Sequence, residues 1–303
     1  MRAVRFHEFG DPHVLKVEDA PDPHAGPGEV RIRVQAASVN PFDLKVRAGH
    51  LAQVVPTTFP AITGTDAGGV VDEIGSDVTG VEAGDQVFGL GQGTTGEHAV
   101  LTAWAPVPST WTAEQGAAAG LASATALACF DAVGDISGRT VLIEGAAGGV
   151  GSAAVQIAVA RGATVIGTAS EGNHEFLREL GAIPITYGPG LAERVAAVAP
   201  NGIDAAVDTA GSGSLADIVA IVGDTSRVAT IADFGAAALG VTLVTGNANA
   251  AEHLAEASRL GENGSYTPSV QATYPLEKAA DAHAHVESGH TRGKVLIGVL
   301  IGH

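Results

Sequence analysis

Cysteine is almost absent from this chain of 303 residues, in which Cys129 is the single example. One cysteine cannot form an intrachain disulfide, and such usage fits a protein of a reducing compartment. It also excludes a zinc site built from several cysteine thiolates. We therefore expect neither a disulfide nor a cysteine-rich metal centre.

Basic residues are also scarce. Lys and Arg number 16 against 33 Asp and Glu, which gives a formal net charge of −17 at pH 7. A surface of this sign repels phosphate backbones, so we expect no nucleic-acid partner. An anionic cofactor would have to be held by local backbone donors, because the overall field opposes its binding.

Long apolar runs are missing too. No stretch of 18 apolar residues runs without polar interruption, so we expect no membrane span. The opening Met1-Arg-Ala-Val-Arg-Phe6 begins a strand pattern and lacks the apolar block of a signal peptide. Hydrophobic residues make up 46% and charged residues 16%, which is typical of a folded globular protein. We expect a cytoplasmic protein.

Short strands separated by Gly and Pro are predicted over about the first 110 residues. They include 1–6, 29–37, 68–74 and 86–89, and the first two are alternating or β-branched runs. A Pro-rich loop, Pro21-Asp-Pro-His-Ala-Gly-Pro-Gly28, separates the first strands. The pattern favours a β-rich region of small barrel-like character.

Helices and strands alternate from about Trp111 onward. The predicted helices are 112–133, 150–161 and 173–180, and the predicted strands are 140–144, 164–168, 204–208 and 228–231. This rhythm calls for a parallel sheet covered on both faces, hence an α/β protein. Near the end we predict a strand around 266–270, a helix at 276–288 and a strand at 294–300. These elements would complete the first domain, so the domains are 1–114 plus 262–303, and an inserted 115–261.

A glycine-rich loop, Gly145-Ala-Ala-Gly-Gly-Val-Gly151, joins the strand at 140–144 to the helix that follows. A helix N-terminus offers unpaired N–H groups and partial positive charge, which suit a diphosphate. Strand, glycine loop, helix and second strand together predict a dinucleotide site of the Rossmann kind. The expected cofactor ligands are Gly145, Ala147, Gly148, Gly149, Val150 and Gly151.

The end of the second strand bears on the choice of cofactor. NAD-binding loops usually place Asp or Glu there, on the ribose 2′-hydroxyl. Here the neutral Ser170 stands at that place, and Asn173 and His174 add possible donors to a 2′-phosphate. Glu171 argues for NADH, unless its side chain points outward. We predict NADPH, with Ser170 and Asn173 as ligands.

Five segments in order resemble one family. They are Ser38-Val-Asn-Pro-Phe-Asp-Leu-Lys45, Gly64-Thr-Asp-Ala-Gly-Gly-Val-Val71, Gly84-Asp-Gln-Val-Phe-Gly89, the Gly145 loop and Arg292-Gly-Lys-Val-Leu296. The chain resembles the medium-chain dehydrogenase/reductase superfamily, in its zinc-free quinone oxidoreductase (zeta-crystallin-like) branch. The resemblance implies a GroES-like β-rich catalytic domain with an inserted, doubly wound Rossmann domain. It further implies a homodimer, with Thr125 near the nicotinamide and Tyr187 near the adenosine.

Zinc-dependent relatives carry Cys and His ligands where this chain has Asn40 and Thr65, and Leu121 is the counterpart of a further cysteine. The histidines show no metal-ligand spacing, and we expect His283 and His285 to lie on the surface. We therefore predict no metal. Without zinc the Lewis acid that assists alcohol oxidation is missing, so reduction of an electrophilic acceptor is the natural chemistry.

Hydride that reaches a quinone or an enone leaves charge on oxygen, so the site needs a hydrogen-bond donor. The resemblance places Asn40 near nicotinamide and substrate. Asn40-Pro41-Phe42-Asp43 also has the pattern of a helix start, and both roles stay open. His50 stands near the place where many relatives carry Tyr, and Lys45 is a further candidate donor; an exposed, solvated side chain without a role is the alternative interpretation for both.

The function expected from these features is an NADPH-dependent oxidoreductase that transfers hydride to a small quinone or α,β-unsaturated carbonyl compound. Two alternatives remain at this point. One is an enoyl-thioester reductase of polyketide or fatty-acid assembly, which would need a pantetheine-sized channel. The other is a noncatalytic NADPH-binding sensor protein.

Overall fold

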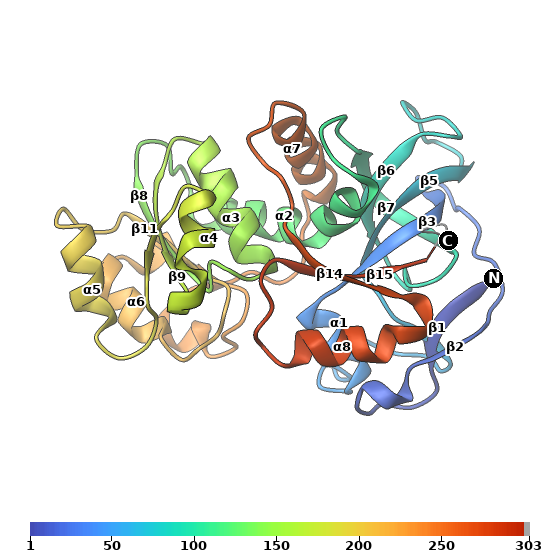
Figure 1. Cartoon of the computed structure of the whole chain (residues 1–303), viewed down its shortest axis with the longest axis horizontal. Helices are drawn as coiled ribbons and strands as arrows, with labels where there is room; N and C mark the ends of the chain where they lie inside the picture. The colour runs from blue at the N-terminus through green and yellow to red at the C-terminus, as the bar shows by residue number, and fades with distance from the viewer. Residues whose placement is uncertain (300–303) are drawn as a thin grey trace. The chain divides into compact units, whose positions relative to one another are not determined.

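The computed structural model describes residues 1–299, and the chain forms two units (Figure 1). Unit 1 comprises Met1–Leu121, Ala250–Glu262 and Pro268–His303. Unit 2 comprises Ala122–Asn249 and Asn263–Thr267. The α/β fold class, with a β-rich unit and a parallel-sheet unit inserted in it, is confirmed.

A six-stranded sheet in the order β14-β15-β3-β5-β6-β7 forms the body of unit 1. Strand β3 also pairs with β7, so the strands from β3 to β7 close into a small barrel. The strands are β3 (Val30–Val39), β5 (Asp66–Ile74), β6 (Gln86–Gly91), β7 (His98–Pro106), β14 (Val270–Pro275) and β15 (Lys294–Gly298). A second sheet contains β2 (Lys16–Asp19), β1 (Arg2–Phe6) and β4 (Ala61–Ile62).

The alternation of apolar and basic residues in β3 sets the barrel interior. Val30, Ile32 and Val34 are fully buried, whereas Arg31 and Arg33 point away from the core. The buried valines pack with apolar residues of β5, β6 and β7, among them Val71 and Leu101, to form one core.

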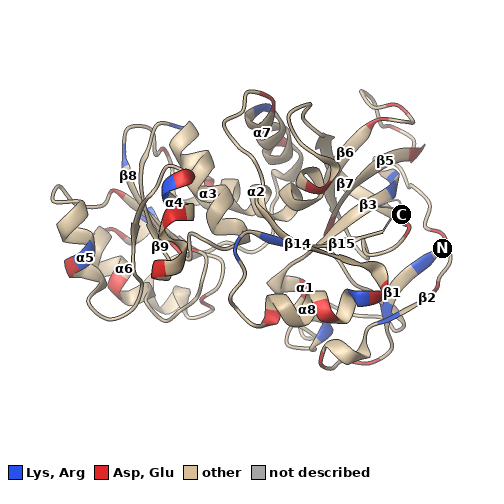
Figure 2. Ribbon diagram, in the orientation of Figure 1, with Lys and Arg blue, Asp and Glu red and all other residues tan. Residues whose placement is uncertain are grey.

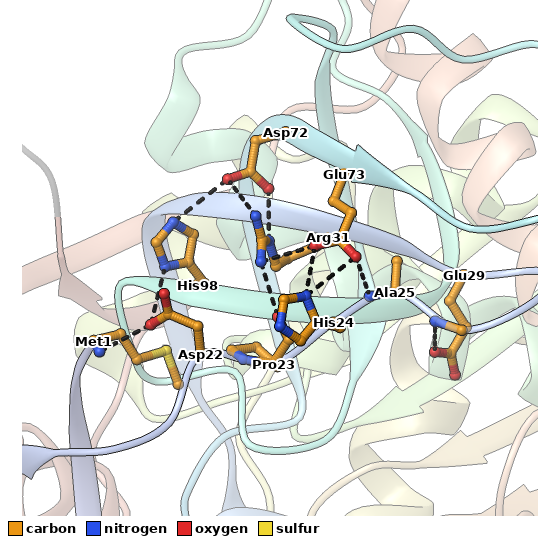
Figure 3. Close-up of polar contacts among 11 residues, drawn as sticks. Met1, Asp22, Pro23, His24, Ala25, Glu29, Arg31, Asp72, Glu73 and His98 are labelled. Carbon is orange, nitrogen blue, oxygen red and sulfur yellow. Dashed lines mark hydrogen bonds and ion pairs between the residues drawn. The ribbon is translucent and has the colours of Figure 1, made fainter.

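Arg31 also organises a charged cluster on the outside of the barrel, which Figure 3 shows. Its Nε lies 3.0 Å from Asp72 Oδ1, and its Nη1 lies 2.8 Å from Glu73 Oε2. His98 Nε2 lies 3.4 Å from the other oxygen of Asp72. Arg31 Nη1 also donates to the carbonyl oxygen of Pro23 at 3.0 Å, so the cluster fastens the Pro-rich loop to the barrel.

Six parallel strands in the order β10-β9-β8-β11-β12-β13 form the sheet of unit 2. They are β8 (Thr140–Glu144), β9 (Thr164–Thr168), β10 (Ile183–Ile185), β11 (Ala205–Asp208), β12 (Val228–Thr230) and β13 (Thr242–Leu243). The helices of this unit are α3 (Gly149–Ala160), α4 (His174–Glu179), α5 (Leu191–Val198) and α6 (Leu215–Val222). Strand order reverses between β8 and β11, and ligands bind at the carboxyl ends of strands at such a point.

Helix α2 (Ala113–Val133) contributes residues to both units. By length and composition alone it could cross a membrane, but 72% of its most apolar window is buried inside the protein. Burial in the core therefore accounts for its apolar composition.

Helix α7 (Ala250–Glu262), which the sequence-based division placed in the nucleotide-binding domain, clusters with unit 1 because it packs on β7. There Ser258 Oγ donates to the carbonyl oxygen of Pro106 at 2.7 Å.

The C-terminal elements differ in part from the prediction. The strand expected around 266–270 is wrong in position, because β14 begins at Val270 and pairs in parallel with β15. The helix expected at 276–288 is a 3₁₀ turn (Leu276–Lys278) followed by α8 (Ala279–Glu287). The last strand is found as expected from Lys294 to Gly298, whereas Leu300 lies outside the described residues.

Candidate active site

The Gly145 loop joins β8 to α3, as predicted. Gly145 has a φ of 75°, a left-handed conformation that favours glycine. A Cβ on Gly151 would stand 2.2 Å from the carbonyl oxygen of Gly145, so a side chain would push α3 away from the turn. The glycines thus bring the start of α3 close to the end of β8.

The N-terminus of α3 provides the backbone donors that a diphosphate needs. Gly148 is its N-cap residue and makes no side-chain cap, and the first turn of this helix of 12 residues carries no acid. The N–H groups of a first helical turn lack intrahelical partners and carry partial positive charge. These residues therefore fit the diphosphate of a dinucleotide.

Two acids lie at the switch point, where the strand order reverses between β8 and β11, and both accept hydrogen bonds from protein hydroxyls. Glu144, which ends β8 and is 1% exposed, accepts hydrogen bonds from Thr168 Oγ1 at 2.7 Å and Ser212 Oγ at 2.9 Å. Asp208, which ends β11, accepts from Thr230 Oγ1 at 2.8 Å. Sequence reasoning missed both, although Glu144 directly precedes the first glycine of the loop. Their carboxylates are satisfied within the protein by these donors.

The end of β9 carries the residues expected to select the cofactor. Ser170 is exposed, and its Oγ accepts a hydrogen bond from Asn173 Nδ2 at 3.3 Å. The side chain of Glu171 is exposed. Within residues 1–299, the half-buried His174 has its Nε2 buried without a hydrogen-bond partner.

Tyr187 and Thr125 occupy different parts of unit 2. Tyr187 is 51% exposed, in a loop that Arg194 supports by donating to the carbonyl oxygens of Thr186 and Gly188, each at 2.7 Å. Thr125 is half-buried on α2. Tyr187 therefore offers an aromatic ring to a ligand at the same sheet edge as Ser170.

In unit 1 a buried polar network surrounds Asn40. Asn40 is the N-cap of α1 (Pro41–Arg47) and forms a capping box with Asp43, as its sequence pattern indicates. Its Nδ2 donates to Asp66 Oδ1 at 2.8 Å and to Asp43 Oδ2 at 3.0 Å. Its Oδ1 accepts from Lys294 Nζ. Both amide protons of Asn40 are therefore committed inside the protein.

The other members of this network come from neighbouring strands. Asp66 on β5 is fully buried, and it accepts from Ser38 Oγ at 2.6 Å and from the N–H of Leu121 at 2.7 Å. Thr65 is half-buried and donates from Oγ1 to Asp43 Oδ1 at 2.5 Å. Asn40 and Thr65, which the resemblance predicts to stand in place of zinc ligands, thus belong to one hydrogen-bond network.

Burial governs the protonation of this network. Desolvation raises the pKa of Asp43 to about 6, although the hydrogen bond from Thr65 opposes the rise. The same desolvation lowers the pKa of Lys294, and the nearby carboxylates of Asp66 and Asp43 oppose that change. The described part of the chain holds no group of three or more His, Cys, Asp or Glu side chains suited to a metal ion.

The other proposed donors lie at and after the end of α1. Lys45 is half-buried, and His50 is exposed, with its backbone N–H donating to the carbonyl oxygen of Lys45 at 2.9 Å. His50 is thus held near α1 by its backbone while its side chain faces solvent.

The expectation that His283 lies on the surface is wrong. Its side chain is 1% exposed on α8, where Nδ1 lies 3.4 Å from Arg47 Nη1. Desolvation, together with the Arg47 charge, lowers the pKa of His283 to about 3. The spacing of the histidines does not reveal this burial, because α8 packs on α1, a contact between residues far apart in the sequence. His285, by contrast, is half-buried and meets Tyr274 Oη at 3.1 Å.

Comparison with known proteins identifies the family. An alcohol dehydrogenase GroES-like domain model matches residues 26–133, and a zinc-binding dehydrogenase model matches residues 180–297. Quinone oxidoreductase of Rattus norvegicus is 30% identical over 97% of this chain and 96% of its own length. The 2-methylene-furan-3-one reductase of Solanum lycopersicum is 31% identical over 98% of this chain and 79% of its own length.

Solved structures agree with this result. The quinone oxidoreductase from Coxiella burnetii has a TM-score of 0.86 and 30% identity, with 99% of both chains covered. A mycobacterial protein complexed with NADPH has a TM-score of 0.86 and 27% identity, covering 98% of this chain and 100% of its own. A GroES-like unit and a Rossmann-like unit define the class of medium-chain dehydrogenases/reductases. Within this superfamily, the chain belongs to the quinone oxidoreductase branch, and it is an oxidoreductase.

Proposed function

We propose that this protein is an NADPH-dependent, zinc-independent reductase of small quinones or α,β-unsaturated carbonyl compounds. The observation that carries the proposal is the Gly145 loop at the switch point of unit 2, where the uncapped start of α3 offers backbone donors to a diphosphate. The relatives named quinone oxidoreductase and 2-methylene-furan-3-one reductase support this substrate class.

The proposed cofactor contacts divide between diphosphate and adenosine. The backbone of Gly145, Ala147, Gly148, Gly149, Val150 and Gly151 would hold the diphosphate. Ser170 and Asn173, whose side chains are at least partly exposed, would meet the 2′-phosphate. Tyr187 would pack against the adenosine, and Thr125 and Asn40 would serve the nicotinamide end. When bound, the nicotinamide supplies a hydride from C4.

At the reacting end the chain must stabilise and protonate the oxygen that becomes negative. We propose Lys45 and His50 as hydrogen-bond donors that stabilise this oxygen, since neither side chain is fully buried. Asn40 would act by organising the network, because Lys294, Asp43 and Asp66 occupy its amide. No step of this scheme calls on a metal. A cytoplasmic homodimer is the proposed working form.

A steady-state assay tests the proposal. NADPH oxidation is followed with 1,4-benzoquinone, a naphthoquinone and 2-cyclohexen-1-one, with NADH in parallel. We expect turnover with NADPH and a larger rise in melting temperature with NADPH than with NADH, because a ligand of the native state raises it. Tight NADPH binding without turnover of any acceptor would instead support the sensor, and turnover confined to enoyl thioesters would support the assembly-line reductase.

A further inference from the structure

The hydroxyl of Thr65 and the carboxyl of Asp43 form a pair that the proposed function leaves unused. Their oxygens Oγ1 and Oδ1 lie 2.5 Å apart. Asp43 is 4% exposed, whereas Thr65 is half-buried. Thr65 therefore links a buried acid to the accessible side of unit 1.

The two oxygens of Asp43 have different partners. Oδ2 accepts from the backbone N–H of Asn40 at 2.8 Å and from its Nδ2 at 3.0 Å. Oδ1 accepts from the Thr65 hydroxyl, which can rotate. When Oδ1 is protonated, the hydrogen bond to Thr65 is kept with its direction reversed, because the carboxyl then donates to Thr65 Oγ1. The hydroxyl hydrogen of Thr65 is then released to point elsewhere.

Asp66 is more constrained than Asp43. Its Oδ2 accepts from the backbone N–H of Leu121, and its Oδ1 accepts from the amide of Asn40 and the hydroxyl of Ser38. Each oxygen of Asp66 accepts from an N–H group, which can only donate, so a proton on either oxygen would weaken or break such a bond even though the Ser38 hydroxyl can rotate. The single ammonium of Lys294 compensates one of two buried carboxylates, and burial without compensation is costly. Asp43 is the place in the network for an exchangeable proton, consistent with its pKa of about 6.

We propose that the Thr65 hydroxyl, backed by Asp43, delivers the proton that completes reduction of the substrate. The inference deepens the proposed function and rests on it. Hydride addition places an electron pair on the substrate oxygen. That oxygen takes the proton of the Thr65 hydroxyl, and Thr65 Oγ1 takes the proton of Asp43. The Asp43 carboxylate then regains a proton from water, so one hydride and one proton are consumed in each turnover.

The charged groups around Asp43 set the pH at which this relay works. Asp66 faces it from β5, and Lys294 reaches the same network from β15. On α8, which packs against α1, His283 and Glu287 contact Arg47. The relay needs Asp43 protonated, so kcat should fall as pH rises through the pKa of about 6.

Thr65→Val tests the relay with 2-cyclohexen-1-one as substrate. It removes the hydroxyl at nearly constant volume, so kcat should fall roughly a hundredfold, the scale of a lost acid catalyst, while the Kd of NADPH stays unchanged. The remaining activity should no longer change with pH around pH 6. Thr65→Ser should restore most of the lost kcat, because it returns the hydroxyl.

Thr102→Val, which alters an exposed threonine on β7, is the matched control. Equal kcat and pH profiles in wild type and Thr65→Val would overturn the relay.

A measurement without turnover separates the relay from the proposed function. The side-chain carboxyl ¹³C signal of Asp43 is titrated in wild type and Thr65→Val. We expect a midpoint near 6 that rises further in the variant, because the Thr65 hydrogen bond lowers the pKa of Asp43. A wild-type midpoint at the ordinary value of about 4 would overturn the relay. A raised midpoint in a protein that reduces neither quinones nor enones would support Asp43 as the site of an exchangeable proton. It would overturn the proposed reductase function.

Discussion

Asp43 binds its proton more tightly in the folded chain than in the unfolded one, because burial raises its pKa from 3.8 to about 6. Stability from this group is fully present below the unfolded value and is lost as pH rises through the folded one. Asp43→Asn should therefore destabilise the protein more near pH 4.5 than near pH 7, by about 2 kcal/mol. Urea unfolding of both proteins at the two pH values measures this difference. A penalty independent of pH would contradict it.

Cys129 should be inert in the native protein. It is fully buried on α2, and desolvation raises the pKa of its thiol to about 12. The thiolate is the reactive form, so a chromogenic disulfide reagent should react slowly in buffer and quickly in denaturant. Fast stoichiometric reaction of the native protein would show that this part of α2 opens.

The residues of the buried network show what a sequence can reveal at this scale. Asn40 and Asp43 were recognisable as a helix start because they are three positions apart. Asp66 and Lys294 lay within family motifs but had no assigned role. Their convergence on Asn40 depends on strand pairing across more than 200 residues, as in the register of Leu296 with Ser38. The spacing of residues that are close in the sequence does not predict such long-range strand pairing.

At the scale of elements, α3 and the turn before it should tolerate no side chain at Gly151. A Cβ there would stand 2.2 Å from the carbonyl oxygen of Gly145 and 2.8 Å from the Cα of Ala146. Gly151→Ala should shift α3 and weaken NADPH binding by at least tenfold, as measured by fluorescence titration, because the loop's N–H groups would move. Thr102→Val, which alters an exposed threonine on β7 of unit 1, is the control. Equal affinities for both variants would contradict the role of the loop.

Elements were predictable where their signals were local. Strands β8 and β9 have the predicted bounds, because each is a short β-branched run that ends near a glycine or a turn. Strand β14 was misplaced because its alternate residues are half-buried and its position follows from pairing with β15. Helix α7 was missed, although its buried residues, such as Leu254, Ala257 and Leu260, recur at helical spacing.

At the scale of the whole molecule, the net charge of −17 opposes an anionic cofactor. Figure 2 shows acidic residues on both units, and the sequence contains about twice as many acidic as basic residues. Salt screens long-range repulsion, so the association rate of NADPH should rise between low and physiological ionic strength. Stopped-flow fluorescence measures this rate. A falling rate would show that a local positive potential at the Gly145 loop outweighs the net charge.

The position of Lys294 in the last strand of unit 1 has a consequence for synthesis. Unit 2 ends at Thr267, so its sheet can form on a nascent chain before β15 leaves the ribosome. The carboxylates of Asp43 and Asp66 meet their ammonium partner only after the much later Lys294 has emerged. A product that ends before Lys294 would bury two acids without that cation, and its first unit would remain open to proteolysis.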